Sequence, residues 1–244
     1  MVKKEFQKDL EKYFEDGKDS TFDKLSNFPK FVPRQDITRF LAKYEIYKKI
    51  LEVDGSIIEC GVKFGGGLMT FAHLSSIFEP VNYTRKIIGF DTFSGFPNLV
   101  KEDKGSKHSE AKKGGFKADS YEDLKNSISL FDSNRFLGEI PKVELIKGDA
   151  TKTIPKYIKE NQHLVISLLY LDFDIYQPTK IAIENFLPRM PKGSIIVFDE
   201  INNPDFDQEF ANIGKDNNKS KEEEVKQEND SKDKKQDKQK KLEE

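Results

Sequence analysis

Acidic residues stand close to the end of each of five short apolar runs in this sequence. The runs are SIIEC, KIIGF, VELI, VISLLYL and SIIVF, and the acids are Glu59, Asp91, Asp149, Asp172 with Asp174, and Asp199 with Glu200. If the runs are parallel strands, their carboxyl ends meet at one edge of a sheet, where ligands bind in folds of this type. We therefore expect these carboxylates to surround a common ligand site.

A glycine-rich segment from Gly61 to Gly67 follows the first run. Glycines let the backbone approach a ligand closely at a strand-to-helix turn. Asp91 lies 24 residues beyond Gly67, where an acid can accept hydrogen bonds from ribose hydroxyls. Glu59 favours S-adenosylmethionine over a dinucleotide, because a carboxylate suits ammonium and sulfonium charges and would repel a pyrophosphate.

Each of these cofactor residues also has a simpler interpretation. The segment Gly65 to Gly67 could form a plain tight turn, and Asp91 could cap the helix or turn that follows it. Asp149 would lie where an adenine amino group can bind, but its setting in Gly148-Asp149-Ala150-Thr151 also fits a helix cap.

Asp172, Asp199 and Glu200 form a second candidate site, for a divalent metal ion. The fourth and fifth runs should be neighbouring strands, so their terminal carboxylates converge, and like charges close together are unfavourable unless a cation neutralises them. Oxygen ligands suit Mg²⁺, which could bind a substrate hydroxyl and lower its pKa. Asp174 is a possible substitute ligand. The alternative is that these acids cap helices or face solvent.

Helical patterns alternate with the apolar runs, which predicts a doubly wound, Rossmann-like α/β fold with a parallel sheet of about five strands. The expected helices are residues 34–51, 68–77, 120–131, 154–159 and 179–187. The polar stretch 100–119 is too long for a plain connector, and we expect a mobile lid or a substrate loop there.

Composition divides the chain of 244 residues into three parts. Residues 1–30 predict a polar helical segment, residues 31–210 a globular domain, and residues 211–244 a disordered tail rich in lysine and glutamate.

With 41 basic and 43 acidic residues the net charge is −2, so no nucleic-acid partner is expected. A single cysteine, no membrane-spanning run and no secretory signal indicate a cytoplasmic protein without a membrane partner.

Six stretches of the sequence resemble the macrocin O-methyltransferase-like family of class I S-adenosylmethionine-dependent methyltransferases. They cover roughly residues 30–205 in the expected order: FVPRQDITRFLAKYEIYKKI, SIIECGVKFGGGLMTFAHL, KIIGFDTFSGFP, VELIKGDATKTIP, LLYLDFDIYQPT and GSIIVFDEIN. The resemblance implies methyl transfer to a hydroxyl of a small molecule, often a sugar, with a divalent metal assisting.

The resemblance also assigns roles by position. It matches Glu59, Gly61 and Gly65 to the first cofactor motif and Asp91 to the ribose-binding acid. It matches Asp172 and the pair Asp199 and Glu200 to the metal ligands, although an aspartate is commoner at the position of Glu200. No general base is assigned.

One departure from the family concerns the last part of the sheet. Such proteins normally continue with another helix and two more strands, whereas this chain turns polar after residue 206. We therefore expect a sheet without the last two strands, with an exposed edge that a homo-oligomer could cover. The alternative functions are a non-catalytic protein that retains cofactor binding and a nucleotide-dependent oxidoreductase. Glu59 and the absence of a clear proton-transfer Tyr/Lys pair argue against the oxidoreductase.

Overall fold

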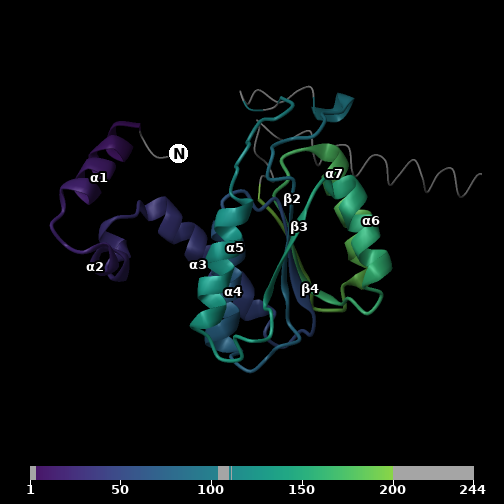
Figure 1. Ribbon diagram of the computed structural model, residues 1–244. Coiled ribbons are helices and arrows are strands. Elements are labelled where there is room, and N and C mark those ends of the chain that lie inside the picture. The colour runs from purple at the N-terminus through teal and green to yellow at the C-terminus, as the bar shows by residue number, and fades with distance from the viewer. Residues whose placement is uncertain (1–3, 104–109, 111, 200–244) are drawn as a thin grey trace, which may run out of the picture.

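The computed structural model describes residues 4–103, 110 and 112–199 of the chain (Figure 1). Glu200 and the predicted tail 211–244 lie outside these residues, as does part of the predicted lid, residues 104–109 and 111. The structural statements below concern the described residues.

All the strands of the sheet are parallel, as the sequence predicts. They are β1 (Ser56–Cys60), β2 (Ile87–Asp91), β3 (Val143–Lys147), β4 (Ile166–Leu171) and β5 (Ile195–Phe198), in the order β3-β2-β1-β4-β5. The order reverses beside β1, and this switch point is where doubly wound folds bind ligands. The predicted Rossmann-like class is therefore confirmed.

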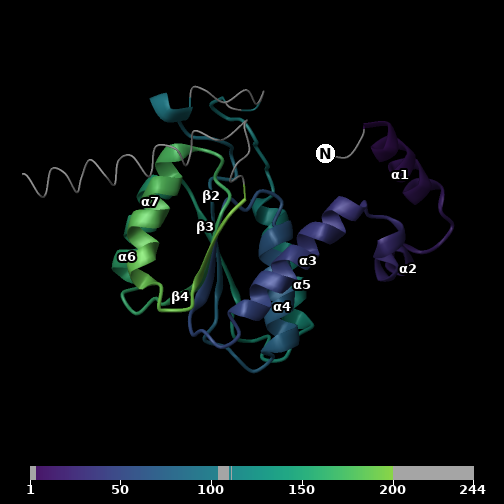
Figure 2. The same ribbon diagram turned by 180° about the vertical axis from the view of Figure 1, so that it is seen from behind.

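Helices cover both faces of the sheet (Figures 1 and 2). The helices α3 (Arg34–Lys49), α4 (Gly66–Phe78) and α5 (Tyr121–Ser133) lie on one face, and α6 (Ala150–Glu160) and α7 (Tyr176–Phe186) lie on the other. Short 3-10 turns occur at Phe28–Lys30, Lys101–Asp103 and Leu187–Arg189. The five expected helices are all present, with ends that differ from the expectation by up to four residues.

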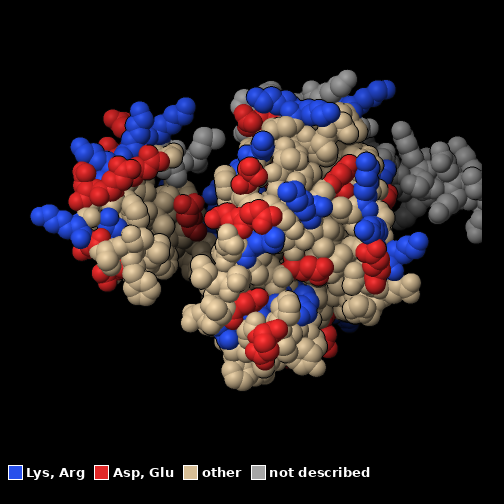
Figure 3. Space-filling view, viewed as in Figure 1, with Lys and Arg blue, Asp and Glu red and all other residues tan. Residues whose placement is uncertain are grey.

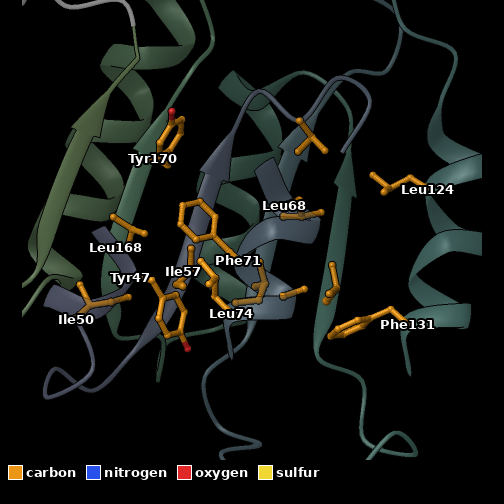
Figure 4. Close-up of a cluster of buried hydrophobic side chains, with 14 of the residues drawn as sticks. Tyr47, Ile50, Ile57, Leu68, Phe71, Leu74, Leu124, Phe131, Leu168 and Tyr170 are labelled. Carbon is orange, nitrogen blue, oxygen red and sulfur yellow. The ribbon is translucent and has the colours of Figure 1, made fainter. Parts of the chain in front are cut away.

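The hydrophobic core has two layers because neighbouring residues of a strand point to opposite faces of the sheet. Ile57 and Leu168 pack with Tyr47 and Phe71 beneath the helices α3 and α4 (Figure 4). The next residues along the same strands, such as Ile58, belong to the second layer, beneath α6 and α7. Both faces of β1 and β4 are buried, which explains their continuous apolar runs.

The N-terminal helices α1 (Lys4–Asp16) and α2 (Thr21–Ser26) lie to one side of the sheet domain in both views (Figures 1 and 2). The rings of Tyr13 and Phe14 pack against Phe31, with centroids 5.5 and 5.2 Å away.

No described helix combines the length and the apolar character needed to cross a membrane. Basic and acidic side chains are interspersed over the face seen in Figure 3, as the near-zero net charge suggests.

A buried arginine at the amino end of the sheet ties the helix α3 to the strands. The side chain of Arg85 is 2% exposed and forms an ion pair with Glu79, with 2.7 Å between Nε and Oε2. Its guanidinium also donates to the carbonyls of Gly55 and Val53 and to the hydroxyl of Ser167. These bonds fix the turn that joins α3 to β1, and so they fix how α3 approaches the sheet.

Replacing Arg85 is expected to destabilise the protein strongly. Arg85→Ala leaves a partly buried carboxylate and several buried carbonyls without their donor, and breaking a buried pair in this way costs about 3–5 kcal/mol. Chemical denaturation measures the loss. Arg39→Ala is the matched control, because Arg39 pairs with Asp36 on the surface with its side chain 77% exposed. Equal losses for the two variants would contradict the role given to Arg85.

Candidate functional site

A cavity of about 860 Å³ lies at the carboxyl ends of the strands. Its walls come from the start of α3 and the residues before it, the turn after β1, the segments 95–97 and 115–116, and the start of α7. Most of the sequence-predicted site residues that the structure describes line this cavity: Glu59, Gly61, Asp91, Asp149, Asp172 and Asp199. Asp174 lines it as well, whereas Gly65 does not appear in its wall.

Glu59 is a buried carboxylate in the wall of this cavity. The residue is 3% exposed, and its Oε2 atom has no hydrogen-bond partner among the described residues. Burial raises the pKa of Glu59 to about 8, with smaller contributions from the negative charges of Asp199 and Asp91 and an opposing one from Lys43. Oε2 of this acid therefore lacks a hydrogen-bond donor among the described residues, and a ligand in the cavity could supply one.

Two glycines after β1 allow parts of the protein to approach one another closely. A β-carbon at position 67 would lie 1.9 Å from Oε1 of Glu59, so the carboxylate fits beneath the first turn of α4 only because residue 67 is glycine. Gly61 has a φ of +91°, and a β-carbon there would lie 1.9 Å from the carbonyl oxygen of Asp172. Gly66 has open space around it and faces the cavity.

Gly65 forms the turn that leads into α4, and its predicted role in cofactor binding stays a prediction. It precedes α4 with a left-handed φ of +83°, and a β-carbon there would meet the side chain of Leu124. This geometry agrees with the tight turn considered as the alternative.

Asp91 holds the turn after β1 in place. Its Oδ2 accepts hydrogen bonds from the backbone N–H groups of Val62 and Lys63 at 2.7 and 2.8 Å, and its Oδ1 accepts one from Phe93 at 2.6 Å. A carboxylate oxygen can accept two hydrogen bonds, so Oδ1 retains capacity toward the cavity. The predicted bond to ribose therefore remains open to Asp91 alongside this structural task.

Asp149 caps a helix, as the alternative interpretation predicts. Its Oδ1 accepts hydrogen bonds from the backbone N–H and the hydroxyl of Thr151, at 3.0 and 2.7 Å, at the start of α6. The residue also lines the cavity, and its role toward an adenine ring stays a prediction.

The predicted metal ligands that the structure describes lie in a crowded acidic region. Burial, together with smaller contributions from the negative charges of Asp199 and Asp174, raises the pKa of Asp172 to about 9. The hydroxyl of Tyr170 donates a hydrogen bond to Oδ1 of Asp199. Within residues 4–103, 110 and 112–199, no set of three or more acidic, histidine or cysteine side chains is placed to hold a metal. The third predicted ligand, Glu200, lies outside these residues.

The structure adds Lys43 and Tyr170, which the sequence prediction missed. Lys43 reaches from α3 across the start of α4, and its Nζ donates to the hydroxyl of Tyr170 at 3.2 Å. The same ammonium lies 4.2 Å from the centre of the Tyr170 ring. A signal was present in the sequence, because Lys43 stands between Phe40 and Tyr47, at the spacing of the apolar face of its helix.

The predicted lid contributes to the cavity wall. Backbone hydrogen bonds join Phe96 to Gly114 and Gly115, at 2.9 and 3.1 Å, and bring the later part of the insertion over the cavity. Asp103 accepts a hydrogen bond at 2.8 Å from the backbone N–H of Tyr176, the first residue of α7. These contacts support a substrate loop, and its mobility stays a prediction.

The sheet order and the acid-lined cavity at its switch point are those of an α/β methyltransferase fold. The family model described as Macrocin-O-methyltransferase (TylF) matches residues 39–231. The chain therefore belongs to the macrocin O-methyltransferase family, and the resemblance seen in the sequence is confirmed. A search of curated proteins finds no match.

Solved structures agree with this assignment. CalS11, a calicheamicin methyltransferase, shares 36% identity and a TM-score of 0.80 over 84% of this chain and 80% of its own. Its apo structure, described as a TDP-rhamnose 3'-O-methyltransferase, gives 35% identity and a TM-score of 0.72 over 84% and 81%. The O-methyltransferase NovP supports the fold, at 20% identity and a TM-score of 0.55 over 70% and 69%.

Adding a methyl group is expected to be harmful at Gly67 and harmless at Gly66. Gly67→Ala forces the first turn of α4 away from the buried Glu59, and overpacking of this kind costs about 1–3 kcal/mol. Gly66→Ala, at the preceding position of the same helix, places its methyl group in open space. Denaturant midpoints of the ligand-free proteins measure the difference. Similar midpoints for both variants would contradict the close contact between Gly67 and Glu59.

The pKa of Glu59 predicts how stability depends on pH. Folding favours the protonated acid, so its contribution is fully present below about pH 4.5 and is lost as pH rises through about 8. Glu59→Gln removes this titration. In the ligand-free protein the variant should therefore gain stability relative to the wild type between these two values, as measured by denaturation across pH. Glu45→Gln, on the exposed side of α3, is the control. A constant difference between Glu59→Gln and the wild type would contradict the raised pKa.

Proposed function

We propose that the protein is an S-adenosylmethionine-dependent O-methyltransferase that methylates a hydroxyl of a sugar or a glycosylated small molecule. The observation that carries this proposal is Glu59, a buried acid without a hydrogen-bond partner for Oε2 among the described residues, placed in a cavity at the switch point. Membership of the macrocin O-methyltransferase family supports it, as does the likeness to CalS11, described as a TDP-rhamnose 3'-O-methyltransferase.

The residues of the cavity fit this cofactor. Glu59 would accept the ammonium group of the amino acid part, and Gly66 leaves space for the chain to pass. Asp91 has an oxygen that can accept a ribose hydroxyl, and Asp149 lies in the wall for the adenine. When bound, the cofactor supplies an activated methyl group for transfer.

The protein's own contribution to the reaction is mainly to hold the acceptor and to exclude water. A methyl transfer needs the acceptor hydroxyl in line with the methyl carbon, and positioning of this kind accounts for a large part of many rate enhancements. Phe96 and Phe116, whose ring centroids are 5.6 Å apart, belong to the cavity wall and would shield the reacting atoms from solvent. No residue is assigned as the general base.

A divalent metal ion, with Mg²⁺ the best candidate, would be held by Asp172 and Asp199, together with Glu200. Burial and the nearby charges of Asp199 and Asp174 raise the pKa of Asp172 to about 9, and a bound cation would favour its ionised form. Oδ1 of Asp199 already accepts from Tyr170, which leaves Oδ2 for a metal. The metal would lower the pKa of the acceptor hydroxyl when bound.

The remaining parts of this proposal concern the chain as a whole. The methyltransferase domain would comprise residues 31–210, after the segment 1–30 and before the segment 211–244, which is rich in lysine and glutamate. A cytoplasmic location and a homo-oligomer that covers the edge of β5 belong to the same proposal.

Binding of S-adenosylhomocysteine, measured by isothermal titration with and without Mg²⁺, tests the function. We expect a micromolar dissociation constant, equivalent to about −8 kcal/mol, and at least about tenfold weaker binding by Asp91→Ala, since a hydrogen bond to a charged group is lost. Asp123→Ala, on α5 and away from the cavity wall, is the control. No binding to a folded wild-type sample would refute the proposal.

The catalytic part of the proposal needs a second measurement. A screen of sugar nucleotides and glycosides as acceptors should show methyl transfer, and Asp172→Asn and Asp199→Asn should reduce both the rate and its sensitivity to chelators. Cofactor binding without turnover on any acceptor would favour the non-catalytic alternative.

A further inference from the structure

We propose that the N-terminal arm, residues 4–31, docks on a second copy of this chain and forms a two-fold symmetric dimer. In this dimer the arm of each copy covers an apolar patch on the helices α3 and α4 of the other copy. The interface is separate from the edge of β5. The inference does not depend on the proposed function, because it concerns how two chains associate.

The arm has an ordered internal structure but little contact with the rest of its own chain. The ammonium of Lys24, on α2, donates to the carbonyl of Phe14, on α1, and lies 4.8 Å from the centre of the Phe14 ring. Both helices lie to one side of the sheet domain (Figures 1 and 2), and within α1 no side chain is buried. A helix of 13 residues has little stability of its own in water, so α1 needs a surface to pack against.

Large apolar side chains of the arm are exposed. Phe22 is 78% exposed, and the others of this kind are Phe6, Tyr13, Phe14, Leu25 and Phe28. Since a whole aromatic side chain buries roughly 200 Å², their exposed fractions amount to about 600 Å² of surface per arm. Apolar surface of this extent usually marks an interaction site.

A second apolar surface lies on the outer side of α3 and at the end of α4. The rings of Tyr44 and Phe78 join the two helices, with centroids 5.8 Å apart. Leu41, one turn before Tyr44 on α3, is 52% exposed. We call this surface the α3–α4 patch, and it consists of Leu41, Tyr44, Ile77, Phe78, Val81 and Tyr83.

The positions of the two surfaces suit a two-fold axis. The arm precedes the N-terminal end of α3, whereas Phe78 lies beside its C-terminal half, with its ring centroid 6.1 Å from that of Tyr47. Leu41 lies at the middle of α3. If the α3 helices of two copies run antiparallel and cross at Leu41, each arm reaches the α3–α4 patch of the other copy, and symmetry makes both contacts at once.

Area and charge both favour a second copy as the occupant. Each surface is used twice in the dimer, so the buried area can exceed the roughly 1,200 Å² that a specific interface needs. The helix α1 has five acidic residues and three lysines, whereas the last turn of α3 carries Lys48 and Lys49. This acidic excess disfavours an anionic membrane, whose surface helices are rich in lysine and arginine.

The dimer would also support the cavity. Phe28 and Val32, at the junction between the arm and α3, belong to the cavity wall. A partner that holds the arm in place would therefore hold this part of the wall.

The oligomeric state of the full chain tests the inference. Sedimentation velocity at micromolar concentrations should show a dimer. Leu25→Asp in the arm and Leu41→Asp in the patch should each raise the dissociation constant of the dimer at least about tenfold, because a charge is unfavourable at an apolar contact. Leu130→Asp is the matched control and should leave the dimer intact, since Leu130 is 72% exposed on α5, outside both surfaces.

A cysteine at position 41 tests the place of the axis. Leu41→Cys should form a disulfide-linked dimer on mild oxidation, because the two thiols lie close together across the axis. Leu130→Cys should not. The natural Cys60 is buried and does not compete.

Several results would overturn the inference. One is a monomeric wild type, and another is a dimer that survives both Leu25→Asp and Leu41→Asp, which would point to a different interface such as the edge of β5. Equal weakening by Leu130→Asp, or equal cross-linking of the two cysteine variants, would also contradict it. The replaced side chains are exposed, so the variants should fold, and circular dichroism checks that they do.

Discussion

Burial of the Glu59 carboxylate is the constraint around which the site is built. An ionised acid in this position has lost water without gaining a full set of hydrogen bonds, which raises its pKa to about 8. The central strand β1 fixes its backbone, and the close passage of α4 requires glycine at position 67. The unfavourable burial of the acid is thus maintained by the elements that define the fold, and a cationic ligand would relieve it.

The helix α3 connects the stability of the domain to the chemistry of the cavity. The C-terminal end of α3 leads into the turn before β1. Arg85, which precedes β2, donates hydrogen bonds to this turn and to Ser167, and so it joins the turn to β4. Near its middle, the same helix supplies Phe40 and Lys43 to the cavity wall. The anchor at the end of this helix therefore helps to determine where Lys43 meets Tyr170.

The order and class of the elements were predictable because β1 and β4 are buried on both faces and read as continuous apolar runs. That the acids at the strand ends would lie near one another was also predictable, because parallel strands bring their carboxyl ends to one edge of the sheet. The start of α4 was placed two residues late, at Leu68, because Gly66 and Gly67 carry no apolar periodicity although they belong to the first turn.

Other features of the site depend on contacts that no local pattern encodes. Lys43 and Tyr170 are 127 positions apart, and only the packing of α3 on the sheet brings them together. The bonds of Asp91 to Val62 and Lys63 likewise arise from the pairing of β1 with β2. Asp149 is the opposite case, since its capping bond to Thr151 is local and was considered from the sequence alone.

The exchange of protons when S-adenosylhomocysteine binds tests the central claim most directly. Titration calorimetry at neutral pH, in buffers with different ionisation enthalpies and without metal, counts these protons. If Glu59 is a buried acid that becomes ionised beside the ligand's ammonium, the wild type should release a large fraction of a proton on binding, and Glu59→Gln should not. The same proton count in the two proteins would contradict the account.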